Sequence, residues 1–375
     1  MKLYNPNLQL IGGFTKEDAN SHIFNVTPEQ FIGNDTSKIN QAIDFINSKG
    51  YGNVVCNGSY LLDSAIIMKS NVTLINNGLI KLTAAARDNI IRAAIASSTP
   101  ISNIKIEGNG IFQGGDSTWG GDTPTDVNGQ SWRAIGILLA NVTNFEINNI
   151  TLKNTAMWGI CLEQSRYGKI NNVTILQDNS KLNQDGINVR RGSHNIMVND
   201  LYALTFDDTF AITNLTIRND VNFLSATIYE TGKANFDIYQ ITVKNINRPE
   251  VPSGSIPPYI PPVNYGGVLL LCEDGLKIYN VFIDGILGSA QINLGFTNID
   301  YSVTTDATVN DMYNICISNV ATAPLYINRP IKNSSFVNIS TMDITNTYNS
   351  VAFKVGSLNV MRKYHSGNFE FFASV

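Results

Sequence analysis

The chain has 375 residues, a formal net charge of −4 and only 15% charged residues. The mild acidity and the lack of basic clusters argue against nucleic acid as a partner, since phosphate binders carry clustered lysine and arginine. No run reaches the length of a membrane span, so we expect a soluble protein without a membrane partner. A chain of this length without a linker-like stretch is typical of one barrel, propeller or solenoid.

The first residues contain no apolar stretch of signal-peptide length. We therefore expect a protein that stays inside the cell, leaves it by another route or has lost its leader. The four cysteines stand in apolar, strand-like runs without the paired spacing of a zinc site, and we expect neither a metal nor a cofactor. We interpret them as small buried residues, with a disulfide between stacked coils as the alternative. They are Cys56, Cys161, Cys272 and Cys316.

The chain begins with a mixed, polar stretch over residues 1–34, which we expect to be an N-terminal extension. A helix is predicted over residues 35–49, where Asp35 or Thr36 can cap it and Gly50 can end it. Its apolar residues fall on one face, as in an amphipathic helix that covers the exposed end of a solenoid. A helix that binds a partner is the alternative.

From Gly50 onward, short β-rich phrases each end at Asn, Gly or Asp. Taking the polar corner as marker, most phrases recur every 19 to 27 residues, with two longer steps that fit double coils or coils carrying a loop. This repeat predicts an all-β fold, a single parallel β-helix over residues 35–375. The corners stand at positions 149, 172, 199, 219, 240, 280, 319 and 338.

Alternating apolar and polar residues within each phrase send one set of side chains into the interior. Polar corners then align, and stacked asparagines can hydrogen-bond along the axis. We therefore interpret the Asn-x-Ser/Thr triplets as turn and ladder residues rather than glycosylation sites. They include Asn71, Asn141, Asn149, Asn172 and Asn338.

The proline-rich residues 248–266 interrupt the repeat. Because prolines cannot donate to a strand ladder, we predict a loop that protrudes from the helix body. Such a loop can wall a groove beside the acidic coils. A decorative insertion or an oligomer contact is the equal alternative.

Three carboxyl groups are the strongest functional signal. Asp185 lies in Asn183-Gln184-Asp185-Gly186, and Asp207-Asp208 follow one coil later. Because coils stack at about the 4.8 Å spacing of neighbouring strands, Asp185 is predicted almost directly beneath the pair. Crowded like charges raise at least one pKa, and an acid that holds its proton beside an ionised base is what glycosidic cleavage needs. The alternative is that these are ordinary turn residues.

The sequence also resembles a known family, over roughly residues 35–290. In order and spacing it is similar to glycoside hydrolase family 28, the polygalacturonase group within the pectate-lyase-like right-handed β-helices. The resemblance implies a right-handed parallel β-helix. The matching pieces are Asp35-Thr36, Gly58-Ser-Tyr-Leu, Lys69-Ser-Asn-Val-Thr-Leu, Gly108-Asn-Gly-Ile-Phe-Gln-Gly, Trp119, Asn154-Thr-Ala-Met-Trp158, Asn183-Gln-Asp-Gly-Ile-Asn and Asp207-Asp208-Thr-Phe-Ala-Ile.

The resemblance implies a role for each acid. Asp185 and Asp208 activate water, Asp207 is the general acid, and Asn183 orients the site or touches the substrate. The expected stereochemical outcome is inversion. The family's Gly-His-Gly is missing, and Glu230 stands roughly where the histidine is expected. The family's Arg-x-Lys is also missing, so pectin is not the expected substrate.

Four further side chains are weaker candidates for binding sugar. Trp158 lies one coil before Asp185, where it can stack on a sugar ring or belong to the core. Arg190 can grip an anionic polymer, and Tyr229 and Lys233 can do the same. A solvated surface position is the alternative for these three.

The sequence thus predicts an enzyme that hydrolyses a glycosidic bond in a cell-surface or cell-wall polysaccharide, extracellular or virion-associated. A phage tail depolymerase is one form of it. The first alternative is a non-catalytic, carbohydrate-binding phage fibre, and either form admits a homotrimer of side-by-side helices. The second alternative is a polysaccharide lyase in which the acids bind calcium.

Overall fold

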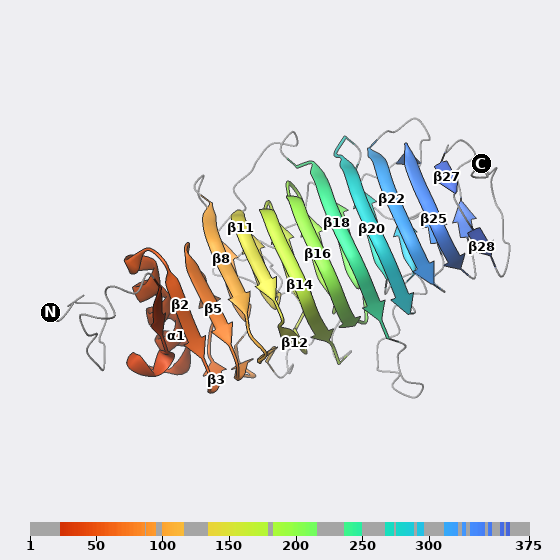
Figure 1. Cartoon of the computed structure of the whole chain (residues 1–375). Coiled ribbons are helices and arrows are strands. Elements are labelled where there is room, and N and C mark those ends of the chain that lie inside the picture. Colours follow the sequence, from red (N-terminus) through yellow and green to blue (C-terminus); the bar gives the residue numbers. More distant parts are fainter. Residues whose placement is uncertain are drawn as a thin grey trace.

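The computed structural model describes residues 23–86, 88–94, 100–115, 134–178, 183–215, 236–249, 267–273, 275–288, 291–295, 311–321, 325–327, 331–341, 344–346, 353–355 and 358–360. Within them the chain winds into coils that step along one axis from the N-terminal to the C-terminal end (Figure 1). Every strand pairing among these residues is parallel, and each strand pairs with strands of the neighbouring coils. The fold is therefore a parallel β-helix, as predicted.

Helix α1 (Asp35–Lys49) covers the N-terminal end of this stack (Figure 1). Its buried residues include Ile39, Ile43 and Ile46, so the amphipathic helix does cap the first coil. The N-cap is Asn34, one residue earlier than expected, and its Oδ1 accepts a hydrogen bond from the Ser37 backbone N–H at 2.9 Å.

The short helix η1 (Pro28–Gln30) and strand β1 precede α1. Strand β1 pairs with β2, so residues 24–26 already belong to the first coil. The longer sheet contains 18 strands among the described residues. They are β1 (Phe24–Val26), β2 (Gly52–Cys56), β3 (Ser59–Leu62), β5 (Val72–Asn76), β6 (Leu79–Leu82), β8 (Ile101–Glu107), β9 (Ile111–Gln113), β11 (Val142–Asn148), β12 (Thr151–Lys153), β14 (Arg166–Leu176), β16 (His194–Leu204), β18 (Ile238–Arg248), β20 (Ile278–Gly288), β22 (Met312–Ala321), β24 (Ile331–Lys332), β25 (Ser334–Thr341), β27 (Phe353–Val355) and β28 (Leu358–Val360).

The shorter sheet contains 10 strands in the described part of the chain. Its register aligns one interior residue from each coil, so that aliphatic side chains stack along the axis. Burying each such side chain contributes about 1.5–3 kcal/mol. The strands are β4 (Ile66–Ile67), β7 (Ile91–Ala94), β10 (Ile137–Ala140), β13 (Ile160–Glu163), β15 (Ile187–Arg190), β17 (Phe210–Asn214), β19 (Val268–Cys272), β21 (Ile292–Leu294), β23 (Leu325–Ile327) and β26 (Ile344–Asn346).

Asparagines turn the corners of the coils in a left-handed backbone conformation, which Asn tolerates better than most residues. The five triplet asparagines named above, Asn71, Asn141, Asn149, Asn172 and Asn338, have positive φ, between 50° and 63°. Asn172 Nδ2 donates to Asn149 Oδ1 at 2.9 Å on the neighbouring coil. The prediction that these residues form turns and ladders is confirmed.

Aromatic rings form a second ladder on the longer sheet, at the first or second residue of consecutive strands. The rings of His194 and Tyr239 stack at 4.6 Å, those of Tyr239 and Tyr279 at 5.2 Å, and those of Tyr279 and Tyr313 at 4.9 Å. His194 is thus a coil residue, as predicted. None of the four cysteines, all of which lie in the described residues, forms a disulfide, and three of them are buried, which supports the interpretation as small packing residues.

Candidate active site

The paired aspartates lie in a five-residue turn, residues 205–209, that leads into strand β17. The Thr205 hydroxyl donates to the backbone oxygen of Asp207 at 3.0 Å and lies 3.0 Å from the Thr209 hydroxyl. A carboxylate oxygen of Asp207 accepts the backbone N–H of Asp208 at 3.0 Å. These local bonds fix the turn and therefore the directions in which the two carboxyl groups leave it.

Asp185 lies one coil earlier. Ile187 is in register with Phe210, an offset of 23 residues that aligns Asp185 with Asp208. The backbone N–H of Gly186 donates to the backbone oxygen of Asp208 at 2.8 Å. Adjacent coils are separated by about 4.8 Å. The three carboxyl-bearing residues therefore lie on two adjacent coils, at the corner that precedes the shorter sheet.

Glycine is required after Asp185. A Cβ on Gly186 would lie 2.2 Å from the Thr209 backbone oxygen of the next coil. Only a residue without a side chain lets the two turns approach this closely. The Asp-Gly pair thus has a packing reason that is separate from any chemistry of the carboxylate.

Asp208 lies in the most unusual electrostatic environment of the site. Its side chain is only 5% exposed, and its Oδ1 has no hydrogen-bond partner among the described residues. Burial, and then the charge of Asp207, raise the pKa of Asp208 well above its usual value, while the Arg248 guanidinium acts in the opposite direction. Asp207 is partly exposed. The resemblance makes Asp207 the acid, whereas the structure gives Asp208 a strong preference for a proton.

Asp185 is also buried, with 4% of its surface exposed. Its Oδ2 accepts a hydrogen bond from Asn188 Nδ2 at 3.0 Å. Ile187 and Val189 point into the core, so Asn188 and its partner lie on the outer side of β15. Asp185 therefore does not face the apolar interior. Sequence reasoning overlooked Asn188, although it ends the quoted motif three residues after Asp185.

The residues that flank Asp185 on its N-terminal side also have defined places. Asn183 is partly exposed and adopts a left-handed conformation with φ of 55°. Gln184 is buried, and its Nε2 donates to the Thr155 oxygen and to Asp178 Oδ1, both at 3.0 Å. These bonds tie the loop of Asp185 to the preceding coil.

Arg190 does not lie on the solvated surface that a grip on a polymer requires. Its side chain is 2% exposed, and its Nε donates to Glu163 Oε2 at 2.9 Å. Arg191 Nε donates to the other oxygen of the same carboxylate at 2.5 Å. One buried glutamate thus holds two arginines from the neighbouring coil. The reason is that the outer side of β15 is itself buried at this position.

Trp158 belongs to the same packed cluster. It lies one coil before Asp185, as predicted. The evidence is that the backbone N–H of Gly159, the next residue, donates to the backbone oxygen of Asp185 at 3.0 Å. The indole is only 5% exposed, and the Arg190 guanidinium lies 4.9 Å from the ring centre. Of the two predicted roles, stacking on a sugar or packing, the structure favours packing.

Several other predicted residues lie outside the described part of the chain. They are Trp119, Tyr229, Glu230 and Lys233, together with residues 250–266 of the proline-rich loop. Arg248, at the end of β18, is a site residue that sequence reasoning missed, because it was assigned to the start of that loop. Within the described residues, no three His, Cys, Asp or Glu side chains gather in a way that could hold a metal ion.

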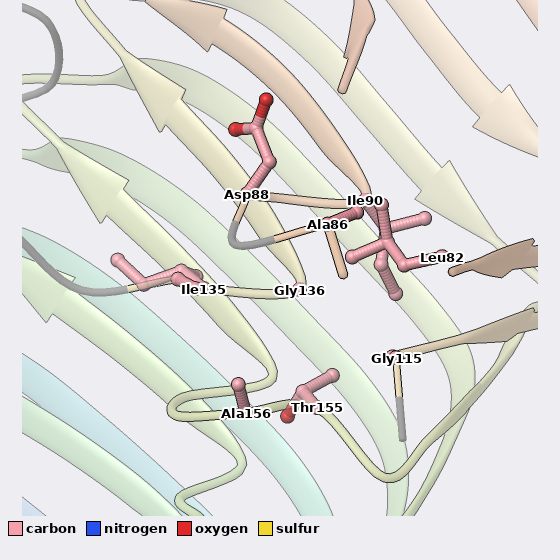
Figure 2. A pocket seen from close by; sticks show the side chains of 11 residues that line it. Leu82, Ala86, Asp88, Ile90, Gly115, Ile135, Gly136, Thr155 and Ala156 are labelled. Atoms are coloured by element: carbon pink, nitrogen blue, oxygen red, sulfur yellow. The ribbon is translucent and has the colours of Figure 1, made fainter. Parts of the chain in front are cut away.

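Figure 2 shows a small hollow, which lies at the same corner of the β-helix two coils before Asp185. Gly136 and Ile135 border it, and Ile137 aligns through Ile160 with Ile187. Its enclosed space is only about 10 Å³, far below the usual range of ligand pockets, about 300–1,000 Å³. Its lining is mostly small or apolar, and Asp88 at its edge is paired with Arg92 at 2.5 Å.

The sequence profile of a family described as Glycosyl hydrolases family 28 matches residues 51–233. This segment contains all three aspartates, and the match confirms the family resemblance. No curated protein is significantly similar to the chain in sequence. No helix in the described residues is long and apolar enough to cross a membrane.

Solved structures of similar fold extend over nearly the whole chain. The hyperthermoactive exopolygalacturonase of Thermotoga maritima is 14% identical with a TM-score of 0.55, covering 91% of each chain. PfbA, a surface adhesin of Streptococcus pneumoniae, is 13% identical with a TM-score of 0.54, covering 92% of this chain and 91% of the other. A tailspike protein mutant of E. coli bacteriophage HK620, in complex with a pentasaccharide, is 14% identical with a TM-score of 0.51; 91% of this chain and 63% of that one are covered. At these identities the likeness establishes the right-handed β-helix alone.

Proposed function

We propose that the protein is a glycosidase that hydrolyses a polysaccharide of a cell surface or cell wall. The observation that carries this proposal is the stacking of Asp185 against the Asp207–Asp208 turn, joined by the hydrogen bond from the Gly186 N–H to the Asp208 backbone oxygen. The family profile, which spans both coils, supports it. Two neighbouring carboxyl groups in different surroundings, one buried and one partly exposed, are the combination that acid–base cleavage of a glycoside uses.

In the proposed reaction one carboxyl group gives its proton to the glycosidic oxygen as the bond to the anomeric carbon breaks. A water molecule attacks that carbon from the opposite face and loses a proton to a carboxylate. The resemblance assigns the first role to Asp207 and the second to Asp185 and Asp208. We propose inversion of the anomeric centre, which NMR of the first-formed product would detect.

The test is a screen of purified capsule, teichoic acid and pectin polymers for released reducing ends. Asp207→Asn removes the proton donor while keeping the side-chain volume. We expect turnover to fall about 10²–10⁴-fold, the usual contribution of general acid–base catalysis. Unchanged turnover in this variant would remove Asp207 from the mechanism. The missing Arg-x-Lys leads us to expect little activity on pectin.

The second candidate is a carbohydrate-binding protein without catalysis. The likeness of fold to a surface adhesin favours it, although that likeness extends to the fold alone. Binding of a glycan without new reducing ends, in wild type and Asp207→Asn alike, would support this candidate. An unsaturated product that absorbs in the ultraviolet would instead indicate a lyase.

We further propose an extracellular or virion-associated location, with a homotrimer as one form of assembly. Side-by-side β-helices need an apolar outer strip, and the longer sheet presents part of one. Met197 and Phe282 are 41% and 51% exposed and lie in one register column with Thr242 between them. Light scattering on the purified protein distinguishes a trimer from a monomer.

A further inference from the structure

The acidic turn is held from the coil above by one arginine. Arg248 is the last residue of β18, and its Nη2 donates to the Thr205 backbone oxygen at 3.1 Å. Thr205 is the residue whose hydroxyl bonds the Asp207 backbone. The guanidinium is therefore linked to the first residue of the turn that carries both aspartates.

The position of Arg248 is fixed on both sides. Asn247, its neighbour, is in register with Tyr202 of the coil below, and Arg248 itself is in register with Gly288 of the coil above. A Cβ on Gly288 would lie 1.9 Å from the Arg248 backbone oxygen, so the backbone is closely covered. Only 9% of Arg248 is exposed. A buried cation in a fixed place acts strongly on nearby charges, because little water screens it.

The charged groups around Asp208 come from three coils. Asp207 precedes it in the turn, Asp185 is aligned with it on the coil below, and Arg248 approaches from the coil above. Of these neighbours, Asp207 disfavours the charged form of Asp208, and Arg248 is the cation in the described part of the chain that favours it. Asp208 is buried, which also disfavours its charged form. A base must be ionised to accept a proton from water, so these surroundings oppose the role that the resemblance gives Asp208.

We propose that Arg248 is a positioning residue that fixes the Thr205–Thr209 turn and supplies the positive charge that favours the carboxylate form of Asp208, the form that the base role requires. The inference rests on the proposed hydrolysis for its catalytic meaning, but its electrostatic content concerns Asp208 alone. Arg248 touches the turn, not the reacting atoms, so its effect passes through Asp208.

Three substitutions separate the two contributions of Arg248. Arg248→Met keeps the apolar stem and loses both charge and donor. Arg248→Gln loses the charge, but its amide retains a donor for the Thr205 oxygen, and it replaces the first variant if that one does not fold. Arg248→Lys keeps the charge. The matched control is Arg92→Gln, which removes a partly buried arginine from β7, four strands before β17 in the shorter sheet.

The first readout needs no substrate. Carboxyl resonances of ¹³C-labelled aspartate are followed against pH, with Asp208→Asn identifying the signal of Asp208. We expect both neutral variants to move the titration midpoint of Asp208 upward by about one pH unit or more, as loss of a nearby opposite charge does. Arg248→Lys and Arg92→Gln are expected to leave it near the wild-type value. An unchanged titration in the neutral variants would overturn the proposal.

The second readout is the pH profile of kcat/KM for reducing-end release. If Asp208 is the base, the acidic limb moves upward with its titration, so activity at a fixed pH on that limb falls about tenfold when the limb moves by one pH unit. A uniform loss at every pH, with an unmoved limb, would show that Arg248 acts through folding or the position of the turn and would overturn the electrostatic part of the proposal. A wild type that cleaves no polymer would refute the proposed function but leave the titration result intact.

Discussion

Replacing Asp208 by asparagine should change how the stability of the protein depends on pH. In the folded protein, burial and Asp207 raise the pKa of Asp208, whereas in the unfolded chain an aspartate titrates near 3.9. The folded state therefore holds a proton that the unfolded state has lost. The stabilisation is fully present below about pH 4 and is lost as the pH rises through the folded pKa.

The size of the effect follows from one proton. Between the two pKa values, the free energy of unfolding of the wild type falls, relative to Asp208→Asn, by up to about 1.4 kcal/mol per pH unit. Above the folded pKa the difference becomes constant. Arg248 stays protonated between pH 4 and pH 8. Loss of the Asp208 carboxyl therefore shifts the free energy of unfolding by a constant amount through Arg248 and adds no pH dependence.

Urea unfolding at half-unit steps between pH 4 and pH 8 measures the difference. Asp208→Ala is the matched control, since it also lacks the carboxyl group but loses packing as well. Its stability should lie parallel to that of Asp208→Asn, displaced by a constant amount. A wild type that runs parallel to both variants over the whole range would refute the buried, proton-retaining carboxyl.

Two further predictions concern packing around the site. Gly186→Ala places a Cβ 2.2 Å from the Thr209 oxygen and should destabilise the fold by about 1–3 kcal/mol, seen as a lower Tm with an unchanged set of carboxyl groups. Arg190→Met leaves Glu163 buried with one cation fewer, and we expect the free energy of unfolding to fall by about 3–5 kcal/mol. If the KM of this variant for an anionic polymer does not rise, Arg190 does not contact the substrate.

Much of the architecture follows from periodicity. The 19 to 27-residue repeat fixed the coil length, and the offset of 23 between the two acidic coils agrees with the spacing expected from it. Corner asparagines were predictable because few other residues accept a positive φ at low cost. The capping helix was predictable from its apolar face, whereas its cap at Asn34 differs by one residue, as helix ends commonly do.

The burial of the outer side of the sheet was not predictable in the same way. Alternation along β15 shows which side chains leave the core, and it correctly turns Asn188 and Arg190 outward. Whether such a side chain then meets water depends on what lies over the sheet, which strand periodicity does not encode. For the same reason the Glu163 pairing escaped prediction, since its partners are 27 and 28 residues away.

The parallel register has a consequence for when the acidic cluster exists. Each coil contacts mainly its immediate neighbours, so opening can begin at either end and advance one rung at a time without disturbing distant rungs. The two rungs that bear the aspartates lie well inside the stack, between β13 and β19. Fraying at the termini therefore leaves the three aspartates in place. A shortened chain that keeps the central coils should retain them in the same arrangement.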